Sequence, residues 1–515
     1  MKQFVFIIFS SLFSYSADCQ GTWTWIGGSK YANDGGVYNG ASQWPGSRTR
    51  SCFVKNDSEM YVFGGAGIGN NGKIGRLNDL WQWNGESWRW LSGSDSAFNL
   101  GYFHGNRVPV GRSGGACYFQ KTSNELYVFG GTSYQLDEQK DEITHGYRND
   151  LWKWDGYNWT LVNGDSTLSG LPTYQDNNGG KFWPPSISGA LYWQDSQNFN
   201  LYGGLVFEKD SLHRIFYSNE WWQFDSVGWS LKQGGEKVYD FLPDYPTHKG
   251  QFEIKSQPGR RRWSAVATSS SGYPFIYGGV AYDHFGQYLN YRNDLWKWNG
   301  QHWGWLAGDS SYNQNASYCK PKCDPGALSG AAAWVDNHDN FWMFGGGRGS
   351  KPLHNNMWVW TENKWHLFDG AKPDNSKGIY GKIDEVDPGN WPGARIGAAT
   401  WCDNNGNLWL FGGYGYDADS NLGYLNDLWK FTPDTNFTIA IKEPKEHQLH
   451  VYPNPASTVL RIENNEFGGY VMSMHGQKVM LFNSIQNELN ISNLPVGAYF
   501  IRFNNGVVKK IVVAR

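Results

Sequence analysis

Residues Asn293–Ser310 read NDLWKWNGQHWGWLAGDS and place four tryptophans among eighteen residues. Near-copies of this stretch recur along the chain of 515 residues. A large aromatic side chain that returns at one position of every repeat fills the same place in each repeated unit. The stretch therefore indicates a repeat architecture, and its tryptophans form either a sugar-binding surface or the packing between units.

Two further signals recur in step with it. Six apolar runs end in a Gly-Gly pair, and the first glycines of successive pairs are 66, 73, 75, 67 and 67 residues apart. An Asn-led motif containing Trp follows each pair, and a Trp-led segment ending in Gly follows the first five motifs. The pairs are Gly64-Gly65, Gly130-Gly131, Gly203-Gly204, Gly278-Gly279, Gly345-Gly346 and Gly412-Gly413.

Each unit offers four short strands with turn residues between them, which is typical of one blade of a β-propeller. Six units begin, but the sixth stops near Asp434 without its Trp-led strand. Residues Thr22–Ser29 (TWTWIGGS) align with Ser87–Ser94 (SWRWLSGS), so we predict that the N-terminal strand completes the last blade. The predicted fold class is all-β: a six-bladed propeller over residues 20–434, closed by the N-terminal strand, and a small C-terminal β-sandwich. Nineteen of the 29 tryptophans occupy repeated strand positions, which favours packing between blades over a ligand surface.

The Gly-Gly pairs, the later Asn-Asp-x-Trp motif and the spaced tryptophans resemble kelch repeats, as in kelch and galactose-oxidase-like propellers. The resemblance extends over about residues 22–434. Galactose-oxidase-like proteins hold copper with two Tyr, two His and a thioether-linked Cys. This chain has no Tyr-His pair, and none of its cysteines can be assigned to that role. We therefore expect no metal, no other cofactor and no catalytic residue of that type.

The propeller pattern ends near Asp434, and a polar linker over residues 435–448 leads to a tail over residues 449–515. Three motifs of this tail resemble the C-terminal sorting domain of the bacterial type IX secretion system. The resemblance implies that the tail engages the type IX machinery, directs passage across the outer membrane and is then removed. The motif residues are Tyr452, Pro453, Asn454, Pro455, Leu494, Pro495, Gly497, Tyr499, Lys509 and Lys510.

The first 19 residues are predicted to be a signal peptide. Lys2 supplies the positive start, and the apolar run Phe4–Phe13 is too short to span a bilayer as a helix. Ala17 and Cys19 occupy the small-residue positions of a cleavage site, although a lipid-modified Cys19 stays open as an alternative. We expect a secreted or outer-surface protein with no transmembrane segment after signal removal.

Composition excludes two classes of protein. The net charge is -3, charged residues make up 18% and aromatic residues make up 17% of the chain. A nucleic-acid-binding protein needs a strong cationic field, and a disordered protein has few aromatic residues. We therefore expect a folded protein that does not bind nucleic acid.

The cysteines do not describe a disulfide framework. Cys319 and Cys323 in CKPKC are close enough to form a possible disulfide in an oxidising compartment. Cys52, Cys117 and Cys402 lie in apolar strand-like runs, where we expect small buried hydrophobic residues.

Arginines recur three positions after the proline that opens a unit, and Arg50, Arg260 and Arg262 add charge nearby. The kelch resemblance implies that such arginines line the mouth of the central channel, where they would suit a carboxylate or another anion. The alternative is that they pair with acidic residues of adjacent blades. The recurring arginines are Arg48, Arg112, Arg261 and Arg395.

Long segments between the second and third strands, such as Thr132–Arg148 and Val280–Arg292, predict a loop-rich face that carries the binding site. Their non-repeating aromatic and polar residues suit a glycan or a peptide. The candidates are Tyr282, Asp283, His284, His145 and His213.

The sequence contains no nucleophile elbow, zinc-protease motif or phosphate loop. The predicted function is an exported binding or adhesion protein for an unknown protein or glycan ligand. The alternative is a carbohydrate-active enzyme, a lyase, epimerase or oxidase, on the same scaffold. A channel mouth that brings an Arg together with a His or Tyr would favour the enzyme.

Overall fold

Every regular element that the computed structural model describes is a β-strand. The chain divides into two compact units, Met1–Thr435 and Asn436–Arg515, and each is described by itself. The described residues are 21–57, 59–103, 106–137, 142–164, 168, 182–195, 198–207, 215–234, 243–282, 289–318, 323–369, 374–433, 450–463, 468–474, 477–483, 486–503 and 508–515.

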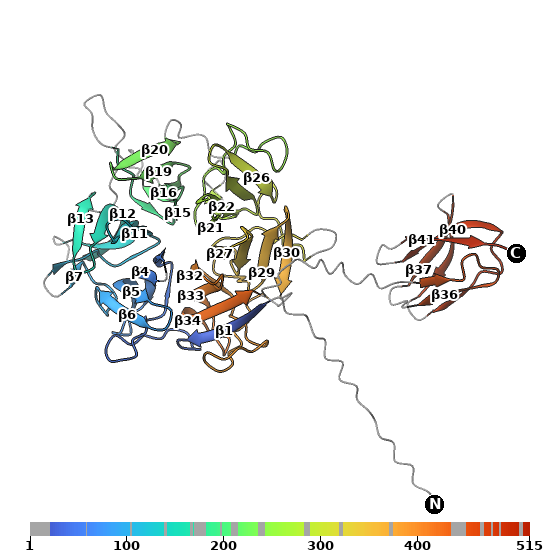
Figure 1. Cartoon of the computed structure of the whole chain (residues 1–515), viewed down its shortest axis with the longest axis horizontal. Coiled ribbons are helices and arrows are strands. Elements are labelled where there is room, and N and C mark those ends of the chain that lie inside the picture. Colours follow the sequence, from blue (N-terminus) through green and yellow to red (C-terminus); the bar gives the residue numbers. More distant parts are fainter. Residues whose placement is uncertain are drawn as a thin grey trace, which may run out of the picture. The chain divides into compact units, whose positions relative to one another are not determined.

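In the first unit, six antiparallel sheets follow one another along the chain and surround a common centre (Figure 1). The first sheet contains β2 (Arg48–Thr49), β3 (Cys52–Asn56), β4 (Glu59–Ile68), β5 (Ile74–Trp83) and β6 (Trp88–Ser92). The second contains β9 (Arg112–Ser113), β10 (Ala116–Gln120), β11 (Glu125–Asp137), β12 (Glu142–Trp154) and β13 (Trp159–Asn163). The third contains β15 (Leu191–Gln194), β16 (Phe199–Tyr202), β19 (Trp221–Phe224) and β20 (Trp229–Gln233).

The fourth sheet contains β21 (Ala265–Thr268), β22 (Pro274–Tyr277), β25 (Leu295–Trp298) and β26 (Trp303–Ala307). The fifth contains β27 (Ala332–Val335), β28 (Phe341–Phe344), β29 (Met357–Thr361) and β30 (Lys364–Asp369). The sixth contains β31 (Arg395–Ile396), β32 (Ala399–Cys402), β33 (Leu408–Tyr416), β34 (Leu422–Pro433) and β1 (Gly21–Gly27). Three smaller sheets accompany them among the described residues. They contain β14 (Ile187–Ser188), β17 (Leu205–Phe207) and β18 (Ile215–Tyr217); β23 (Val280–Tyr282) and β24 (Leu289–Tyr291); and β7 (Tyr102–Phe103) and β8 (Asn106–Arg107).

In the first, second and sixth sheets, the Gly-Gly pair of the second strand lies at a bulge, where the register against the third strand shifts. The register between β4 and β5 shifts between Phe63 and Gly65, and Gly64 and Gly65 have φ of 61° and 107°. A Cβ on Gly64 would lie 2.7 Å from the Leu77 carbonyl oxygen. Glycine is required here because the left-handed backbone and the close approach both exclude a side chain.

The N-terminal strand completes the last sheet, as the repeat alignment predicts. β1 pairs antiparallel with β34, so that Trp23 lies opposite Phe431 and Trp25 lies opposite Trp429. Without β1, the edge of β34 would be left unpaired, and unpaired edges promote aggregation.

A closed circuit of six backbone hydrogen bonds joins the innermost strands of successive sheets. Each amide donates to the equivalent carbonyl of the preceding sheet, and the last bond returns to the first sheet. The bonds are Gly114 N to Arg50 O (2.8 Å), Gly189 N to Gly114 O (2.8 Å), Trp263 N to Gly189 O (3.2 Å), Gly330 N to Trp263 O (2.7 Å), Gly397 N to Gly330 O (2.8 Å) and Arg50 N to Gly397 O (2.8 Å).

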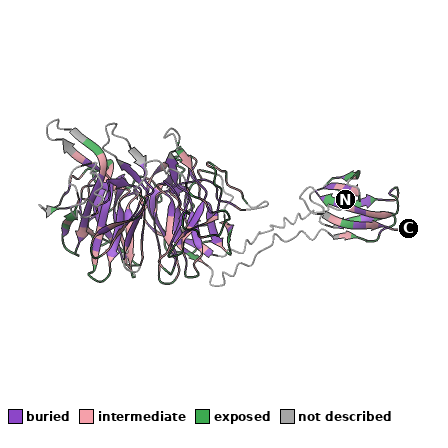
Figure 2. Cartoon of the chain, turned by 90° about the horizontal axis from the view of Figure 1, so that it is seen from above, coloured by how far each residue is buried: buried purple, intermediate pink, exposed green. Residues whose placement is uncertain are grey.

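Aromatic contacts form a second circuit between the same sheets. The first Trp of each outer strand packs on the aromatic residue that precedes the Gly-Gly pair of the neighbouring sheet. Buried side chains accordingly follow the strands, and exposed residues concentrate at the turns (Figure 2). The repeated tryptophans therefore pack sheet against sheet. The centroid distances are 5.5 Å for Trp23–Phe344, 4.9 Å for Trp88–Phe411, 5.3 Å for Trp159–Phe63, 5.0 Å for Trp229–Phe129, 5.8 Å for Trp303–Tyr202 and 5.2 Å for Trp365–Tyr277.

The long segments predicted as loops are largely β-ribbons. Within Thr132–Arg148, Thr132 pairs with Tyr147 and the pairing continues to Asp137 and Glu142. Val280 likewise pairs with Tyr291. The strands resume after the Gly-Gly bulge, because the bulge shifts the register without ending the hydrogen-bonded ladder.

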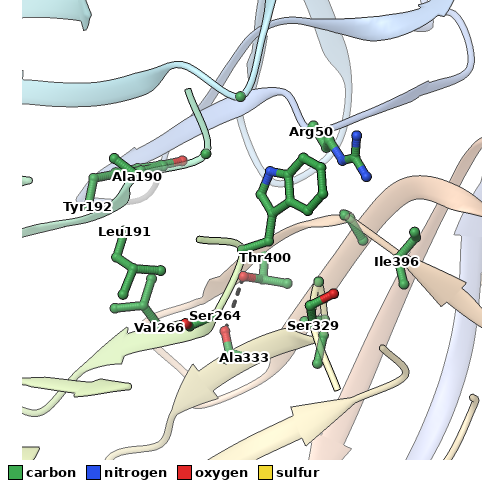
Figure 3. Close-up of a pocket in the computed structure, with 18 of the residues that line it drawn as sticks. Arg50, Ala190, Leu191, Tyr192, Ser264, Val266, Ser329, Ala333, Ile396 and Thr400 are labelled. Atoms are coloured by element: carbon green, nitrogen blue, oxygen red, sulfur yellow. Dashed lines mark hydrogen bonds between the residues drawn. The ribbon is translucent and has the colours of Figure 1, made fainter. Parts of the chain in front are cut away.

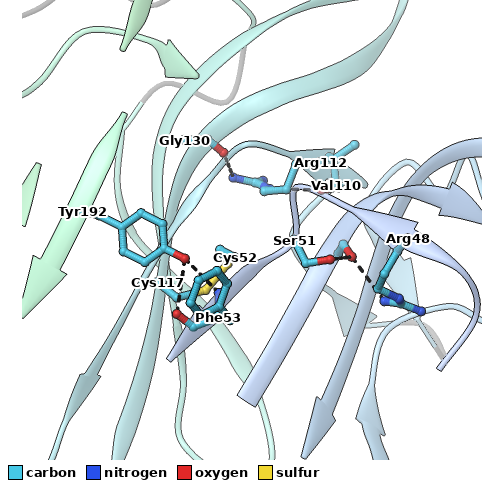
Figure 4. Close-up of a disulfide and its surroundings, with 10 residues drawn as sticks. Arg48, Ser51, Cys52, Phe53, Val110, Arg112, Cys117, Gly130 and Tyr192 are labelled. Carbon is cyan, nitrogen blue, oxygen red and sulfur yellow. Dashed lines mark hydrogen bonds between the residues drawn. A yellow bond between two sulfur atoms is a disulfide. The ribbon is translucent and has the colours of Figure 1, made fainter. Parts of the chain in front are cut away.

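The expectation that Cys52 and Cys117 are simple buried hydrophobic residues is wrong, because they form a disulfide (Figure 4). Their Cα atoms are 5.4 Å apart, and the bond joins β3 of the first sheet to β10 of the second. Only the packing of the two sheets brings the cysteines together. Cys402 is free and partly buried. Cys323 is disulfide-bonded, but Cys319 lies outside the described residues, so their pairing stays a prediction.

The second unit has two sheets around one core. The core includes four fully buried side chains, Leu460, Val471, Ile501 and Ile511. One sheet has the order β35-β36-β39 and the other β38-β37-β40-β41. The strands are β35 (His450–Tyr452), β36 (Val459–Glu463), β37 (Gly469–Ser473), β38 (Lys478–Phe482), β39 (Glu488–Asn490), β40 (Gly497–Phe503) and β41 (Val508–Val513).

The motifs of the tail hold its ends together. The Asn454 side chain donates to the Lys510 carbonyl at 2.9 Å and accepts from the Val512 amide at 2.8 Å. The Tyr499 hydroxyl donates to the Pro495 carbonyl at 2.9 Å. Asn454 therefore fixes the start of the unit against its last strand, and Tyr499 closes the turn before its own strand.

Replacing both Cys52 and Cys117 with Ala should destabilise the first unit by about 4 kcal/mol, because the disulfide closes a long loop in the unfolded chain. Urea unfolding of the oxidised protein and the double variant measures the difference. Cys402→Ala is the matched control and should change the free energy of unfolding little. Equal stability of the double variant and the wild type would contradict this role.

Candidate functional site

The innermost strands of all six sheets line one cavity at the centre of the first unit (Figure 3). Its volume is about 190 Å³. Backbone and small side chains make up much of the lining, so the few large side chains decide its chemistry. One lining residue from each sheet is Phe53, Gly115, Tyr192, Val266, Ala332 and Thr400.

Two positions at this cavity break the repeat. The residue before each inner strand has a left-handed backbone in every sheet, and it is glycine in four of them, with φ of 66° to 68°. Arg50 and Trp263 occupy the same position in the other two sheets, each with φ of 53°. A left-handed conformation costs a non-glycine residue on the order of 1–3 kcal/mol, and such outliers cluster at functional sites. The two exceptions are therefore the first candidates for a site.

Arg50 and Trp263 line the cavity, and Arg262 contacts Trp263 as Arg50 does; we call these three residues the Arg–Trp cluster. The guanidinium carbons of Arg50 and Arg262 each lie 3.7 Å from the centroid of the Trp263 ring. Arg262 also lies 5.1 Å from the Tyr217 ring. Cation–π contact holds the two like charges together on one indole.

The cluster offers donors and positive charge. Among the described residues, neither Arg50 nor Arg262 forms an ion pair. The buried Arg262 Nε and Trp263 Nε1 also have no hydrogen-bond acceptor in the described part of the chain. Burial, with a smaller contribution from Arg262, lowers the pKa of Arg50 to about 10. An anion placed here would supply the missing acceptor and counter-charge.

Tyrosines and further cations surround the cluster. Tyr291 lines the same cavity, and burial raises its pKa while Arg262 and Arg348 oppose that shift. Burial also raises the pKa of Tyr424, against the charge of Arg50. Both hydroxyls therefore stay protonated at neutral pH and can donate hydrogen bonds.

His145 belongs to a separate contact group on the ribbons of the first two sheets. Arg76 Nη1 donates to His145 Nδ1 at 2.9 Å, and the Tyr134 hydroxyl accepts from the Arg76 amide at 2.6 Å. Partial burial and the Arg76 charge lower the pKa of His145. The imidazole is therefore neutral at neutral pH and carries its proton on Nε2, because a guanidinium can only donate.

The four recurring arginines do not line the cavity, which corrects the expectation that they form its cationic mouth. Each forms an ion pair with the Asp of the Asn-Asp motif in its own sheet, and at most 1% of each arginine side chain is exposed. The adjacent-blade alternative is also wrong, because both partners lie in one sheet. The pairs are Arg48–Asp79 (2.6 Å), Arg112–Asp150 (2.7 Å), Arg261–Asp294 (2.9 Å) and Arg395–Asp427 (2.7 Å).

The ion pair is the centre of a repeated network. Arg395 Nη1 donates to the Gly412 carbonyl at 3.0 Å, and Asp427 accepts from Trp429 Nε1 at 2.7 Å and from the Tyr380 hydroxyl at 2.7 Å. The Gly-Gly, Asn-Asp and Trp signals of the sequence thus meet at one buried site.

The sequence contains a signal for this pairing. The two units that lack the arginine carry Ile187 and Leu328 instead. The same two units replace the Asp of the Asn-Asp motif with Glu220 and Asn356. The fifth unit lacks both charged partners, which is the pattern of a buried pair, because one charge left alone in the interior is strongly destabilising. The third unit keeps a carboxylate, and Glu220 accepts a hydrogen bond from Trp222 Nε1 at 2.9 Å.

Several predicted residues lie outside the described part of the chain. Asp283, His284, His213 and the side chain of Tyr282 are among them, so their place at the site stays a prediction. Within the described residues, no group of three His, Cys, Asp or Glu side chains could hold a metal ion. No helix in the described ranges is long and apolar enough to cross a membrane.

Comparison with known proteins assigns the tail. Residues 450–514 match the family described as "Secretion system C-terminal sorting domain". This domain indicates secretion through the type IX system to the cell surface or the medium. No curated protein is significantly similar to the chain. A solved structure titled "Structure of YjhT" covers 75% of this chain and 95% of its own, with a TM-score of 0.43 and 14% identity.

Removing Arg395 alone should cost about 3–5 kcal/mol of stability, because Asp427 would remain buried without its counter-charge. Arg395→Leu with Asp427→Asn reproduces the residues of the fifth unit and should cost less than the two single changes together. Urea unfolding of the four proteins in a double-mutant cycle measures the coupling. Additive single and double effects would contradict a buried ion pair.

Arg50→Gly should stabilise the first unit by about 1 kcal/mol or more, because it removes the left-handed strain and a charge without a partner. Since the folded pKa of Arg50 lies below its ordinary value, its protonation opposes folding, and this penalty is present below pH 10 and is lost as the pH rises above it. Gly330→Ala at the equivalent position should destabilise. Thermal unfolding at pH 7 measures both changes, and destabilisation by Arg50→Gly would contradict the strain.

Proposed function

We propose that residues 20–434 form a six-bladed kelch-type β-propeller that acts as an exported binding or adhesion protein. Three observations support the fold: the sixfold repeat, the closed circuit of inter-sheet hydrogen bonds and the pairing of β1 with β34. The C-terminal sorting domain delivers the protein, so its ligand is a molecule outside the cell. Release into the medium and attachment at the cell surface both agree with this role.

The Arg–Trp cluster carries the proposal. The guanidinium groups of Arg50 and Arg262 have no ion-pair partner in the described residues and both contact the Trp263 indole. Arg50 and Trp263 also occupy strained positions where the repeat has glycine in the other four sheets. Strain that weakens folding is retained where function needs it. The ligand is accordingly a protein or glycan that presents an anionic group to the centre of the propeller.

Recognition follows from the geometry. Charge-assisted hydrogen bonds from guanidinium groups to a carboxylate or a similar anion are stronger than neutral ones. Contact with Trp263 limits the motion of both arginines, so little conformational entropy is lost when the anion binds. A cavity of about 190 Å³ has room for an end group of the ligand. The rest of the ligand would lie on the β-ribbons around it.

The second candidate function is a carbohydrate-active enzyme, a lyase, epimerase or oxidase, on the same scaffold. The contacts among Arg76, Tyr134 and His145 favour it, because they bring an arginine together with a tyrosine and a neutral histidine. His145 Nδ1 is occupied by Arg76, which leaves Nε2–H as a donor. Product formation from a bound glycan, lost in His145→Gln, would favour the enzyme over a binding protein.

Binding of the secreted protein to an array of carboxylated, sulfated and neutral glycans and acidic peptides tests the proposal. We expect retention of anionic ligands, and a loss of about tenfold or more in affinity for Arg50→Ala and Arg262→Ala, because each removes a charged hydrogen-bond donor. Arg89→Ala, an exposed arginine of β6, is the matched control and should bind normally. Unchanged binding in both cluster variants would overturn the site.

A further inference from the structure

The outer face of the four-stranded sheet in the second unit presents a distinct surface. Val471, Ile501 and Ile511 point into the core, so the alternate positions of the same strands point outward. The register places these residues in two rows across the sheet. The outer face consists of Leu481, Tyr470 and Arg502 in one row and Lys478, Met472, Phe500 and Lys510 in the other.

This outer face combines one exposed and three half-buried apolar or aromatic side chains with positive charge. Leu481 is 74% exposed, and Lys478, Arg502 and Lys510 are also exposed. Lys478 Nζ lies 4.2 Å from the centroid of the Tyr470 ring. None of the seven residues is acidic. The opposite sheet differs, because its outward Arg461 pairs with Glu488 at 2.9 Å.

Side chains on such a surface contribute little to the stability of the domain by itself. An exposed leucine beside half-buried aromatic side chains marks an interaction site, and cations without neighbouring carboxylates steer an acidic partner. β38 is also an edge strand, since it pairs only with β37 within the described part of the unit. Its free edge adjoins Leu481 and could accept a further strand.

The Lys509-Lys510 motif separates into two roles. Lys510 lies opposite Phe500 on the outer face and is exposed, whereas Lys509 lies opposite the buried Ile501 on the other side of the sheet. Only Lys510 therefore contributes to the outer face. Substitution of Lys509 is therefore a matched control for substitution of Lys510.

We propose that this outer face is the surface by which the sorting domain docks on a protein of the type IX secretion machinery, and that the partner presents carboxylates around an apolar patch. The family match makes that machinery the partner of the domain. The three cations set the charge of the partner surface. The apolar side chains between them supply the buried centre that a stable interface needs.

Export of the full chain from a bacterium with a type IX system tests the surface. The measured quantity is the fraction that reaches the cell surface and medium. Lys478→Gln with Arg502→Gln and Lys510→Gln should lower it about tenfold or more, and Leu481→Ser should lower it as well. The conservative set Lys478→Arg, Arg502→Lys and Lys510→Arg should export normally. Arg461→Gln with Glu488→Gln, on the opposite sheet, is the matched control.

Thermal unfolding of each purified variant separates loss of docking from loss of folding. Lys510→Glu should impair export more than Lys509→Glu. Normal export of the folded triple-Gln variant would overturn the proposal. A second result would also overturn it: the triple-Gln variant of the full chain loses binding to phosphatidylglycerol vesicles but is exported normally. The face would then contact lipid rather than protein.

Discussion

Six backbone hydrogen bonds between neighbouring inner strands are the constraint on which the first unit depends. Each bond requires a left-handed residue just before the inner strand, and four of the six sheets meet that requirement with glycine. The same positions surround the central cavity. Any side chain at such a position is therefore both strained and placed at the cavity. Arg50 and Trp263 are the two side chains that the fold places there.

Ion pairing separates two sets of arginines in this unit that have different chemistry. Arg48, Arg112, Arg261 and Arg395 are fully buried and neutralised by an aspartate of their own sheet. Each also satisfies a Gly-Gly carbonyl or its equivalent, so the pair links the first, second and third strands. Arg50 and Arg262 have an aromatic ring where the others have a carboxylate. Within the described residues, no carboxylate pairs with their positive charge.

The two compact units have different tasks. The first unit is closed by β1 and braced by the Cys52–Cys117 disulfide, which suits an exported protein because disulfides persist outside the cytoplasm. The second unit carries the sorting motifs, and its Asn454 side chain fixes the last strand in place. Its outer sheet face is exposed and cationic. The proposed binding site and the proposed docking face therefore lie on separate units of the chain.

The sequence by itself determined the repeat, the strand class, the closing role of the N-terminal strand and the sorting tail. These are local patterns: a glycine pair, an Asn-led motif and a spaced Trp each report on the strand that contains them. The same patterns could not show which side chains of different strands or sheets meet in the folded protein. Only the tertiary structure decided that four arginines are buried beside aspartates, that Cys52 meets Cys117, and that Arg50 and Arg262 share the Trp263 ring. The physical reason is that burial and charge pairing depend on residues 30 to several hundred positions apart, such as Arg48 with Asp79, separated by 31, and Thr49 with Gly397, separated by 348.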